Sequence, residues 1–391
     1  MTLQDVRIAV IGAGVSGLAT ASELLAHGAS DVVVLEASHP GSGSSGRSVG
    51  MVETQYVAAP DIEVRAFGRR YYDAVERDHG LSFVHGGYLR LASSAQDLES
   101  YALSVQRQQD AGVTDAVVLS PEEIVARWPH LVVADRVGGL YGPSDGYIDG
   151  HEFCTLATRL VKERGGQVLL NSRVTQAEQK AEGSWLLHTP TGTVEADIVV
   201  NAGGPWAGVV GDLLGCPVPL EPQLHGALTV ELGRPIAEPL PFVMDYVPGS
   251  GQTGVYFRSE RPDQLIAGLH TEEPIFDAVS PDIALGRVSE AFVDELSGLL
   301  ADRLNDCDDA GIGRSWTGIY PMTPDQRPIV GVHPSARTVI CALGTGGNGI
   351  QLAPAVGRMA AEAALGISDR TFSDAVDWSP NRFAAARTER V

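Results

Sequence analysis

The chain has 391 residues, enough for two or three domains with substantial buried cores. Its 49 acidic residues outnumber its 28 lysines and arginines, and the resulting net charge of −21 disfavours binding to nucleic acid or to an anionic membrane surface. Because Cys154, Cys216, Cys307 and Cys341 lie far apart and form no CxxC pair, we expect no metal site, no disulfide framework and a cytoplasmic location.

Residues 6–36 have the pattern of a βαβ unit. An apolar run starting at Val6 enters the turn Gly12-Ala13-Gly14-Val15-Ser16-Gly17, a helix follows, and the next strand ends at Glu36. The glycines let the backbone approach a pyrophosphate at the helix N-terminus, and the Glu36 carboxylate can accept hydrogen bonds from a ribose diol. This context predicts a dinucleotide site but does not separate NAD from FAD.

After residue 36, the sequence predicts several helices and one β-rich segment. A capping box at Ser120-Pro121-Glu122-Glu123 predicts a helix, and a second helix is expected over residues 152–164. Four β-rich pieces between residues 226 and 270 predict an antiparallel meander, and a long amphipathic helix is expected from Pro281 to about Leu304.

Two further glycine segments follow apolar strands. Residues 198–200 lead into Asn201-Ala202-Gly203-Gly204, and a strand over 338–342 leads into Gly344-Thr345-Gly346-Gly347-Asn348-Gly349 and a final helix. Glycine packing explains both, but a helix N-terminus beside a redox ring would also stabilise negative charge on the reduced ring. The first and last parts of the chain have the pattern of alternating strands and helices, and the segment between them is β-rich. This order predicts two interleaved domains.

Taken together, these motifs resemble the D-amino-acid oxidase superfamily of flavoproteins, in particular its glycine/sarcosine oxidase and dimethylglycine dehydrogenase branch. The resemblance rests, in chain order, on the first glycine turn with Glu36, the loop Ser45-Gly46-Arg47-Ser48, the segment 199–206, the turn Thr323-Pro324-Asp325 and the last glycine segment. It implies an α/β plus α+β fold. A Rossmann-like FAD-binding domain (residues 1–82, 146–216 and 316–391) would interleave with a substrate domain built on an antiparallel sheet (83–145 and 217–315).

The resemblance also implies FAD as the cofactor. We expect noncovalent binding, because relatives attach the flavin through a cysteine whose position holds Gly318, or through a histidine where Gly46 and Arg47 stand. The implied cofactor contacts are Gly12, Gly14, Val15, Ser16, Gly17, Glu36, Ala37, Ser45, Arg47, Ser48, Val174, Gly203, Gly346, Gly347, Asn348, Gly349 and Gln351.

The reaction implied by the resemblance is hydride transfer to flavin N5 from a carbon next to a neutral amine, giving an imine that water hydrolyses. Tyr256, His270 and Tyr320 fall where the family places residues of the substrate pocket. His270 titrates near neutrality if unperturbed, and could keep the amine deprotonated. His225 lies where the chain crosses between domains, so it has either a structural role or a place in the site.

The sequence departs from the family at three cationic positions. Two anchors for a substrate carboxylate are replaced by Glu53 and Gln351, and a lysine linked to oxygen activation is replaced by Ile266. Glu53 could meet a cationic or hydroxyl-rich substrate, or it could be a solvated loop carboxylate. Either oxygen is a poor acceptor or Arg258 supplies the missing charge. The chain's two lysines, Lys162 and Lys180, fall in the helix expected over 152–164 and on a polar strand edge.

The preferred hypothesis is oxidation of the C–N bond of a secondary or N-methylated amine or amino acid, with oxygen or a carrier as the electron acceptor. One alternative is oxidation of a 2-hydroxy acid. Another is a role as the FAD-binding subunit of a hetero-oligomeric amine dehydrogenase, and the preferred hypothesis leaves both homo- and hetero-oligomers open.

Overall fold

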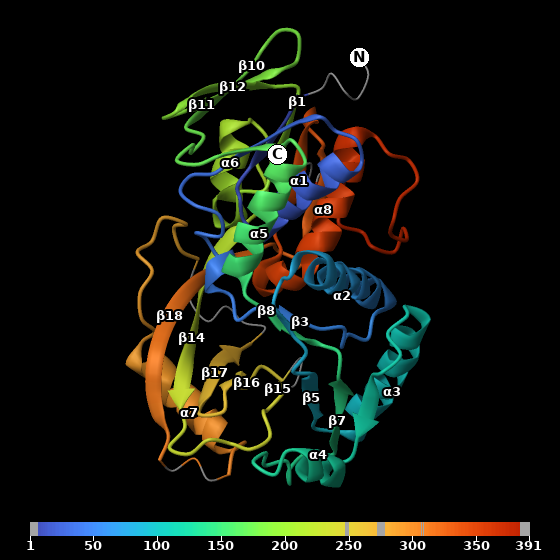
Figure 1. Cartoon of the computed structure of the whole chain (residues 1–391), viewed down its shortest axis with the longest axis vertical. Helices are drawn as coiled ribbons and strands as arrows, with labels where there is room; N and C mark the ends of the chain where they lie inside the picture. Colours follow the sequence, from blue (N-terminus) through green and yellow to red (C-terminus); the bar gives the residue numbers. More distant parts are fainter. Residues whose placement is uncertain (1–6, 247–249, 272–277, 306, 308, 384–391) are drawn as a thin grey trace.

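In the computed structural model the chain forms two adjoining parts, each built around a large sheet and placed one above the other in Figure 1. The structure describes residues 7–246, 250–271, 278–305, 307 and 309–383. Val6, the expected start of the first strand, lies outside these residues. Among the residues described, every helix is too short or too polar to traverse a lipid bilayer.

The upper part contains a six-stranded sheet whose central strands are parallel. Its spatial order is β19 (Ile329–His333), β20 (Ala336–Leu343), β13 (Ile198–Asn201), β1 (Arg7–Ile11), β2 (Asp31–Leu35) and β9 (Gln167–Leu169). Only the edge strand β19 is antiparallel to its neighbour. The central strands are short apolar runs buried on both faces, as expected for a parallel sheet covered on each side.

Alternate residues of β1 pack into two different cores. Ile8 and Val10 face the helices α1 (Val15–Ala26), α5 (Gly150–Glu163) and α8 (Gly349–Leu365). Ala9 and Ile11 face the opposite layer, as the two-residue period of a strand requires. That layer consists of the small sheet β10 (Gln176–Gln179), β11 (Trp185–Thr189) and β12 (Gly192–Ala196), together with α6 (Ala207–Leu213). The βαβ unit is therefore confirmed, with its turn between β1 and α1.

The lower part contains an eight-stranded sheet. Its spatial order is β18 (Gly311–Met322), β14 (Glu221–Glu231), β17 (Gln264–His270), β16 (Gly254–Arg261), β15 (Phe242–Asp245), β5 (Tyr88–Ala92), β7 (Gly138–Gly142) and β6 (Val117–Leu119). Neighbours are antiparallel except β15 and β5. The expected meander is confirmed for β15, β16 and β17, while β14 pairs with β17 rather than with β15.

The two faces of the eight-stranded sheet differ in chemistry. One face carries Leu89, Val243 and Phe257 into an apolar core that includes residues of α4 (Pro121–Arg127) and α7 (Glu290–Ala301). The other face points toward the six-stranded part and bears polar and aromatic side chains. In register across neighbouring strands, Arg90 lies opposite Met244, and Met244 lies opposite Tyr256. The polar face therefore forms one wall between the two parts of the molecule.

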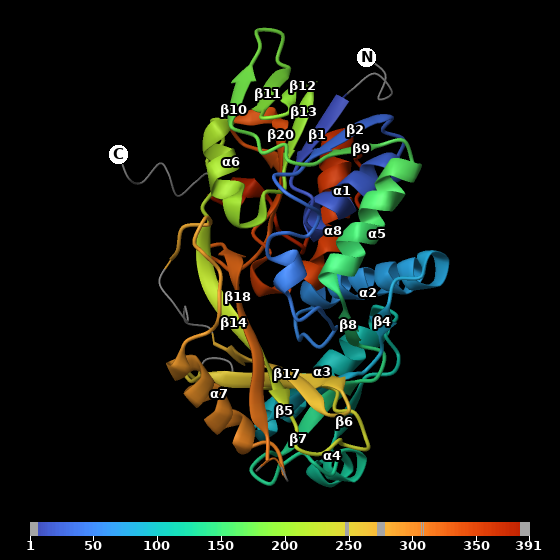
Figure 2. The ribbon, with the colours of Figure 1, turned by 60° about the vertical axis from the view of Figure 1, so that its left-hand side comes forward.

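The remaining elements join the two parts. The helix α2 (Ala59–His79) lies beside the small sheet of β3 (Met51–Val52), β8 (Gly146–Ile148) and β4 (Phe83–Val84), and α3 (Ala95–Asp110) packs beside α2 and the edge of the eight-stranded sheet. Figure 2 shows the long strands β14 and β18 side by side, running from the lower sheet up to the six-stranded part. Strands of the two large sheets come from alternating segments of the chain, although β18 crosses the boundary expected at residues 315/316. The domain boundaries stay a prediction.

Most of the expected helices are present, but one begins later than its sequence suggested. The capping box at Ser120 is confirmed, since its hydroxyl accepts from the Glu123 N–H and Glu123 accepts from the Ser120 N–H. The helix expected from Pro281 starts only at Glu290, after the N-cap Ser289. Within the segment 281–289, the backbone of Gly286 instead exchanges hydrogen bonds with Thr317 on β18.

Candidate functional site

A cavity of about 690 Å³ lies between the two parts of the molecule. It extends from the turn after β1, past the carboxyl ends of β2, β13 and β20, to the polar face of the eight-stranded sheet. This is the edge at which open α/β sheets bind ligands, and the volume is in the range of sites for cofactors and small molecules.

The first glycine turn is built so that the backbone itself forms the cavity wall. Gly12 has φ +108°, and a Cβ there would lie 2.5 Å from the carbonyl oxygen of Ala202. Gly14 is the N-cap of α1 and lines the cavity, whereas Gly17 does not. A Cβ on Gly17 would lie 2.0 Å from the oxygen of Gly12, so this glycine allows α1 to pack closely on the turn.

Glu36 holds the neighbouring backbone in place. Its Oε2 accepts a hydrogen bond from the Ala13 N–H at 2.8 Å, and its Oε1 accepts one from the Ser38 N–H at 2.8 Å. The carboxylate lies almost fully buried on the cavity wall directly after β2. It therefore fixes the turn, and it stands where a ribose diol would meet the end of β2.

The last glycine segment forms the cavity wall next to α8. Gly346 and Gly347 line the cavity, and a Cβ on Gly347 would lie 2.5 Å from the Tyr320 ring. Asn348 lies behind this wall, where its Oδ1 accepts hydrogen bonds from Tyr56 Oη at 3.1 Å and Gln351 Nε2 at 2.6 Å. Asn348 and Gln351 support the loop from behind the cavity wall.

The sheet side of the cavity is aromatic. Tyr256, Tyr320 and Trp316 line it, and the ring of His225 stacks on Tyr320 with 3.8 Å between the ring centroids. Burial raises the pKa of Tyr320 to about 12 and that of Tyr256 well above its ordinary value, so both phenols stay protonated and can donate hydrogen bonds.

The two histidines on this face are neutral near pH 7. Burial, together with the nearby His270, lowers the pKa of His225 to about 4. Burial and the charge of Arg90 lower the pKa of His270 to about 4 as well. The titration near neutrality expected for His270 is therefore wrong, because water is excluded from its charged form and a cation stands nearby. His225 lines the cavity, while His270 lies behind its wall at the end of β17.

Glu53 is fully buried, so the alternative of a solvated loop carboxylate is wrong. Its backbone N–H donates to Gln351 Oε1 at 3.2 Å, and its Oε2 accepts from the Gln55 N–H at 2.5 Å. Glu53 does not line the cavity. The buried Asp145 lies nearby, and burial together with the charge of Glu53 raises the pKa of Asp145 to about 8. Contact between Glu53 and a substrate stays a prediction.

Arg258 lies on the polar sheet face but already has partners. Its guanidinium forms an ion pair with Glu260, stacks 3.4 Å from the centroid of the Tyr147 ring, and donates to the Val49 carbonyl at 3.3 Å. It does not line the cavity. Lys162 lies in α5 and Lys180 forms an ion pair with Glu195, so neither lysine provides a cation at the cavity.

Of the expected site residues, the structure brings most to one cavity. The expected cofactor residues that line it are Gly12, Gly14, Val15, Ser16, Glu36, Ala37, Ser45, Arg47, Ser48, Val174, Gly203, Gly346, Gly347 and Gly349. Those that do not are Gly17, Asn348 and Gln351. Of the expected catalytic residues, Tyr256 and Tyr320 line the cavity, whereas Glu53, Arg258 and His270 do not.

Sequence reasoning missed Trp316 and Arg173, which also line the cavity. Trp316 precedes Gly318 and Tyr320 by two and four positions on β18, so strand alternation from Tyr320 was the available signal. Its indole N–H donates to the Arg47 carbonyl at 2.8 Å, which fixes the cofactor loop against β18. Arg173 precedes Val174 in a loop, and no periodicity marks it.

The sequence matches a known protein family and known proteins over most of its length. The model of the family described as FAD dependent oxidoreductase matches residues 7–363. Mitochondrial sarcosine dehydrogenase from Homo sapiens is 30% identical over 363 residues, covering 90% of this chain and 39% of that protein. Glycine oxidase from Geobacillus kaustophilus is 25% identical over 365 residues, covering 91% of this chain and 92% of that protein.

A solved structure shows the same architecture over nearly the whole chain. The crystal structure of L-proline dehydrogenase from P. horikoshii superposes with a TM-score of 0.85 and 26% identity, covering 98% of this chain and 99% of that one. The chain spans less than half the length of the sarcosine and dimethylglycine dehydrogenases that it matches.

Proposed function

The chain belongs to the family of FAD dependent oxidoreductases, and from this premise we propose that it oxidises the C–N bond of a secondary or N-methylated amino acid or amine. Several relatives at 25% identity or more have names that give a substrate: sarcosine, dimethylglycine, glycine and proline. All four compounds carry an amine next to the carbon that such an oxidation attacks.

The residues on the cavity wall fit FAD, the cofactor of this family. Gly12 and Gly14 leave a backbone cradle that side chains would fill, and α1 begins directly behind it. Glu36 offers a buried carboxylate at the end of β2. None of the chain's cysteines lines the cavity, and the lining residue at position 318 is a glycine, which supports noncovalent binding. When bound, FAD supplies the acceptor for the hydride of the substrate.

The chain's own groups suit an amine that must be neutral to react. The imidazole of His225 is uncharged at neutral pH, so it adds no positive charge beside the amine and offers a lone pair to an N–H. The protonated phenols of Tyr256 and Tyr320 can donate hydrogen bonds to the substrate. Their rings and the Trp316 ring also limit the water that reaches the reacting carbon.

The observation that carries this proposal is the continuity of the cavity. A single cavity joins the glycine turn after β1 to the aromatic wall formed by Tyr256, Tyr320 and His225. A dinucleotide held at the turn therefore shares one cavity with the groups that would hold a small substrate.

An anaerobic screen tests the proposal. The FAD-loaded protein is mixed with sarcosine, dimethylglycine, glycine, proline, simple secondary amines and 2-hydroxy acids, and bleaching of the flavin absorption band is followed. We expect bleaching by at least one amine or amino acid, with an amine or ammonia and a carbonyl compound as products. Bleaching by 2-hydroxy acids alone, or by no compound unless a partner protein is added, would contradict the proposal.

A matched pair of variants connects the activity to the cavity. Tyr320→Phe removes a phenol that lines the cavity, and we expect flavin reduction to slow by about tenfold or more, as for the loss of one hydrogen bond to a reacting group. Tyr141→Phe removes a phenol that packs on Trp128 away from the cavity, and it should leave the rate unchanged.

A further inference from the structure

Two side chains from separate segments of the six-stranded part meet at the edge of the cavity. Arg173 follows β9, and Trp206 follows β13. In the strand order β13, β1, β2, β9, three spacings of about 4.8 Å separate the strands that lead to them (Figure 2). Arg173 Cζ nevertheless lies 5.8 Å from the centroid of the Trp206 ring, and both residues line the cavity. This pair, which we call the bridge, therefore spans the carboxyl ends of β1 and β2, where the glycine turn and Glu36 stand.

A segment of the eight-stranded part reaches the bridge from outside the cavity. Residues 278–289, which we call the strap, lead into α7, and Figure 1 shows them in gold beside the upper part of β18. Near its start the strap is held by β14, because Ala278 pairs with Gln223. Further along it is held by β18, through the hydrogen bonds between Gly286 and Thr317. The residues between these two attachments form the tip of the strap.

A tight turn at the tip of the strap presents Asp282. The Ile283 N–H donates to the Ser280 carbonyl at 3.0 Å, which is the hydrogen bond of a β-turn, and Pro281 occupies the second position that proline favours. The Asp282 N–H also donates to Ser280 Oγ at 3.3 Å. The side chain of Asp282 is 61% exposed, so the turn directs its carboxylate away from the body of the strap.

Asp282 bonds to both residues of the bridge. Its Oδ1 accepts from the Trp206 indole N–H at 2.8 Å and from Arg173 Nη1 at 3.4 Å. The Arg173 pair is long and its side chains are more than half exposed, so it contributes little, and the short bond to the indole is the stronger one. The Trp206 ring also packs near the loop after β2, since a Cβ on Gly43 would lie 3.5 Å from it.

We propose that Asp282 is a clasp for the cofactor: its bond to Trp206 holds the bridge closed over the dinucleotide end of the cavity, and FAD enters or leaves when that bond breaks. Asp282 does not itself line the cavity, so it is a positioning residue that acts through Trp206. The inference goes beyond the proposed reaction, because it concerns the cofactor of the family and holds for any substrate. The rival explanation is that the bond only attaches the strap to the surface.

Release of FAD from the loaded protein separates these explanations. The protein is diluted rapidly, and the rise in flavin fluorescence gives the rate constant of release. Asp282→Ala removes the acceptor, Asp282→Asn keeps an oxygen that accepts from the indole, and Trp206→Phe keeps a ring but loses the N–H. The control is Asp263→Ala. Asp263 is 57% exposed and paired with an arginine, as Asp282 is, but it lies between β16 and β17 and does not line the cavity.

We expect Asp282→Ala to release FAD about fivefold to tenfold faster than wild type, as for the loss of one partly exposed hydrogen bond to a carboxylate. Asp282→Asn and Asp263→Ala should stay within about twofold of wild type, because the first keeps the bond and the second breaks only a surface ion pair. In a Trp206→Phe background, adding Asp282→Ala should change release by less than about twofold, since both changes break the same bond.

The rate at which FAD enters distinguishes a clasp from an ordinary contact. Because the same bond must break before FAD enters, the Asp282→Ala apoprotein should also take up FAD about fivefold to tenfold faster, and Kd should change less than either rate. Equal release from wild type and Asp282→Ala, including no release from either, would overturn the proposal. So would faster release with unchanged or slower entry, or full additivity with Trp206→Phe. None of these measurements uses a substrate, so failure of the clasp is distinguishable from failure of the proposed amine oxidation.

Discussion

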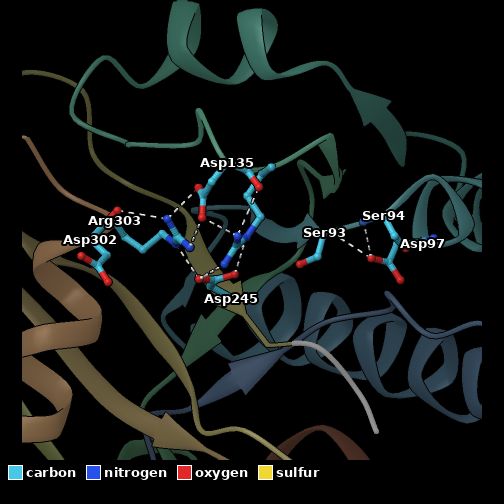
Figure 3. A network of polar contacts seen from close by, with 8 residues as sticks. Ser93, Ser94, Asp97, Asp135, Asp245, Asp302 and Arg303 are labelled. Carbon is cyan, nitrogen blue, oxygen red and sulfur yellow. Dashed lines mark hydrogen bonds and ion pairs between the residues drawn. The ribbon is translucent and has the colours of Figure 1, made fainter. Parts of the chain in front are cut away.

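Replacing Asp245 with alanine is expected to destabilise the eight-stranded part by about 3 kcal/mol or more, because the change removes the buried carboxylate that two interior arginines share and leaves them only the exposed Asp135. Figure 3 shows Arg303 between Asp135 and Asp245. Asp245, at the end of β15, accepts from Arg136 Nε and Nη2 at 2.9 Å each and from Arg303 Nε. Its side chain is 10% exposed, and those of Arg303 and Arg136 are 8% and 15% exposed.

Asp135 is the matched comparison within the same network. It accepts two hydrogen bonds from Arg303 at 2.9 and 3.0 Å, but its side chain is 55% exposed. Water can replace an exposed carboxylate, so Asp135→Ala should cost about 0–1 kcal/mol. The expected difference between the two alanine variants is therefore several kcal/mol, although each removes a bidentate partner of an arginine.

Urea unfolding at pH 7, followed by circular dichroism, measures this difference. The Asp245→Ala variant should unfold at clearly lower urea than Asp135→Ala, and Asp245→Asn, which keeps the acceptor oxygen, should lie between them. Equal midpoints for the two alanine variants would refute the argument, since they would show that burial does not decide the strength of these ion pairs.

Glu36→Ala should weaken FAD binding about tenfold to hundredfold, as for the loss of a charged hydrogen-bond acceptor. The control Glu99→Ala, which changes an exposed carboxylate, should leave FAD binding unchanged. A fluorescence titration of the apoprotein with FAD measures the affinity of both variants. Burial raises the pKa of Asp145 to about 8, so this carboxyl stabilises the fold below pH 4 and loses that contribution as pH rises to 8. Asp145→Asn should therefore gain about 2 kcal/mol over wild type between pH 6 and 8, and a gain that does not change with pH would contradict the assignment. Burial lowers the pKa of His225, so the effect on stability runs in the opposite direction with pH. Neutral His225 contributes to the stability of the fold above pH 6.5, and this contribution is lost as pH falls toward 4. His225→Gln should make unfolding less sensitive to acid between pH 6.5 and 4.5, and an unchanged acid sensitivity would show that His225 does not titrate in this way.

The parts of the fold that were predictable are those fixed by local pattern. The run from β1 through Gly12 to Glu36 carries its own strand, turn and acid within 36 residues, and the Ser120 capping box is likewise local. The start of α7 was not predictable in the same way. In the segment before it, Gly286 exchanges hydrogen bonds with Thr317 on β18, a contact that depends on a residue some thirty positions further along the chain.

The residues of the site divide in the same way, into those that a local pattern predicts and those whose role depends on distant parts of the chain. The glycines that line the cavity were found from their spacing, because their role is a matter of backbone shape. The charged residues were harder to place, because burial decides what they do. The sequence left Glu53 open between a substrate contact and a solvated loop carboxylate, and it is fully buried; Arg258 is already paired with Glu260.

The strand order of the six-stranded sheet has a consequence for how the protein folds during synthesis. β1 pairs with β13, which begins at Ile198, and β13 in turn pairs with β20, which begins at Ala336. One edge of β1 can pair at once with β2, but its other edge must wait until β13 is made, and until then that edge is open to wrong partners. FAD cannot assist early, because the last wall of its cavity is made by residues 344–350. Yield in a cell should thus depend on chaperone supply and slow translation more than on the cofactor supplied at the start.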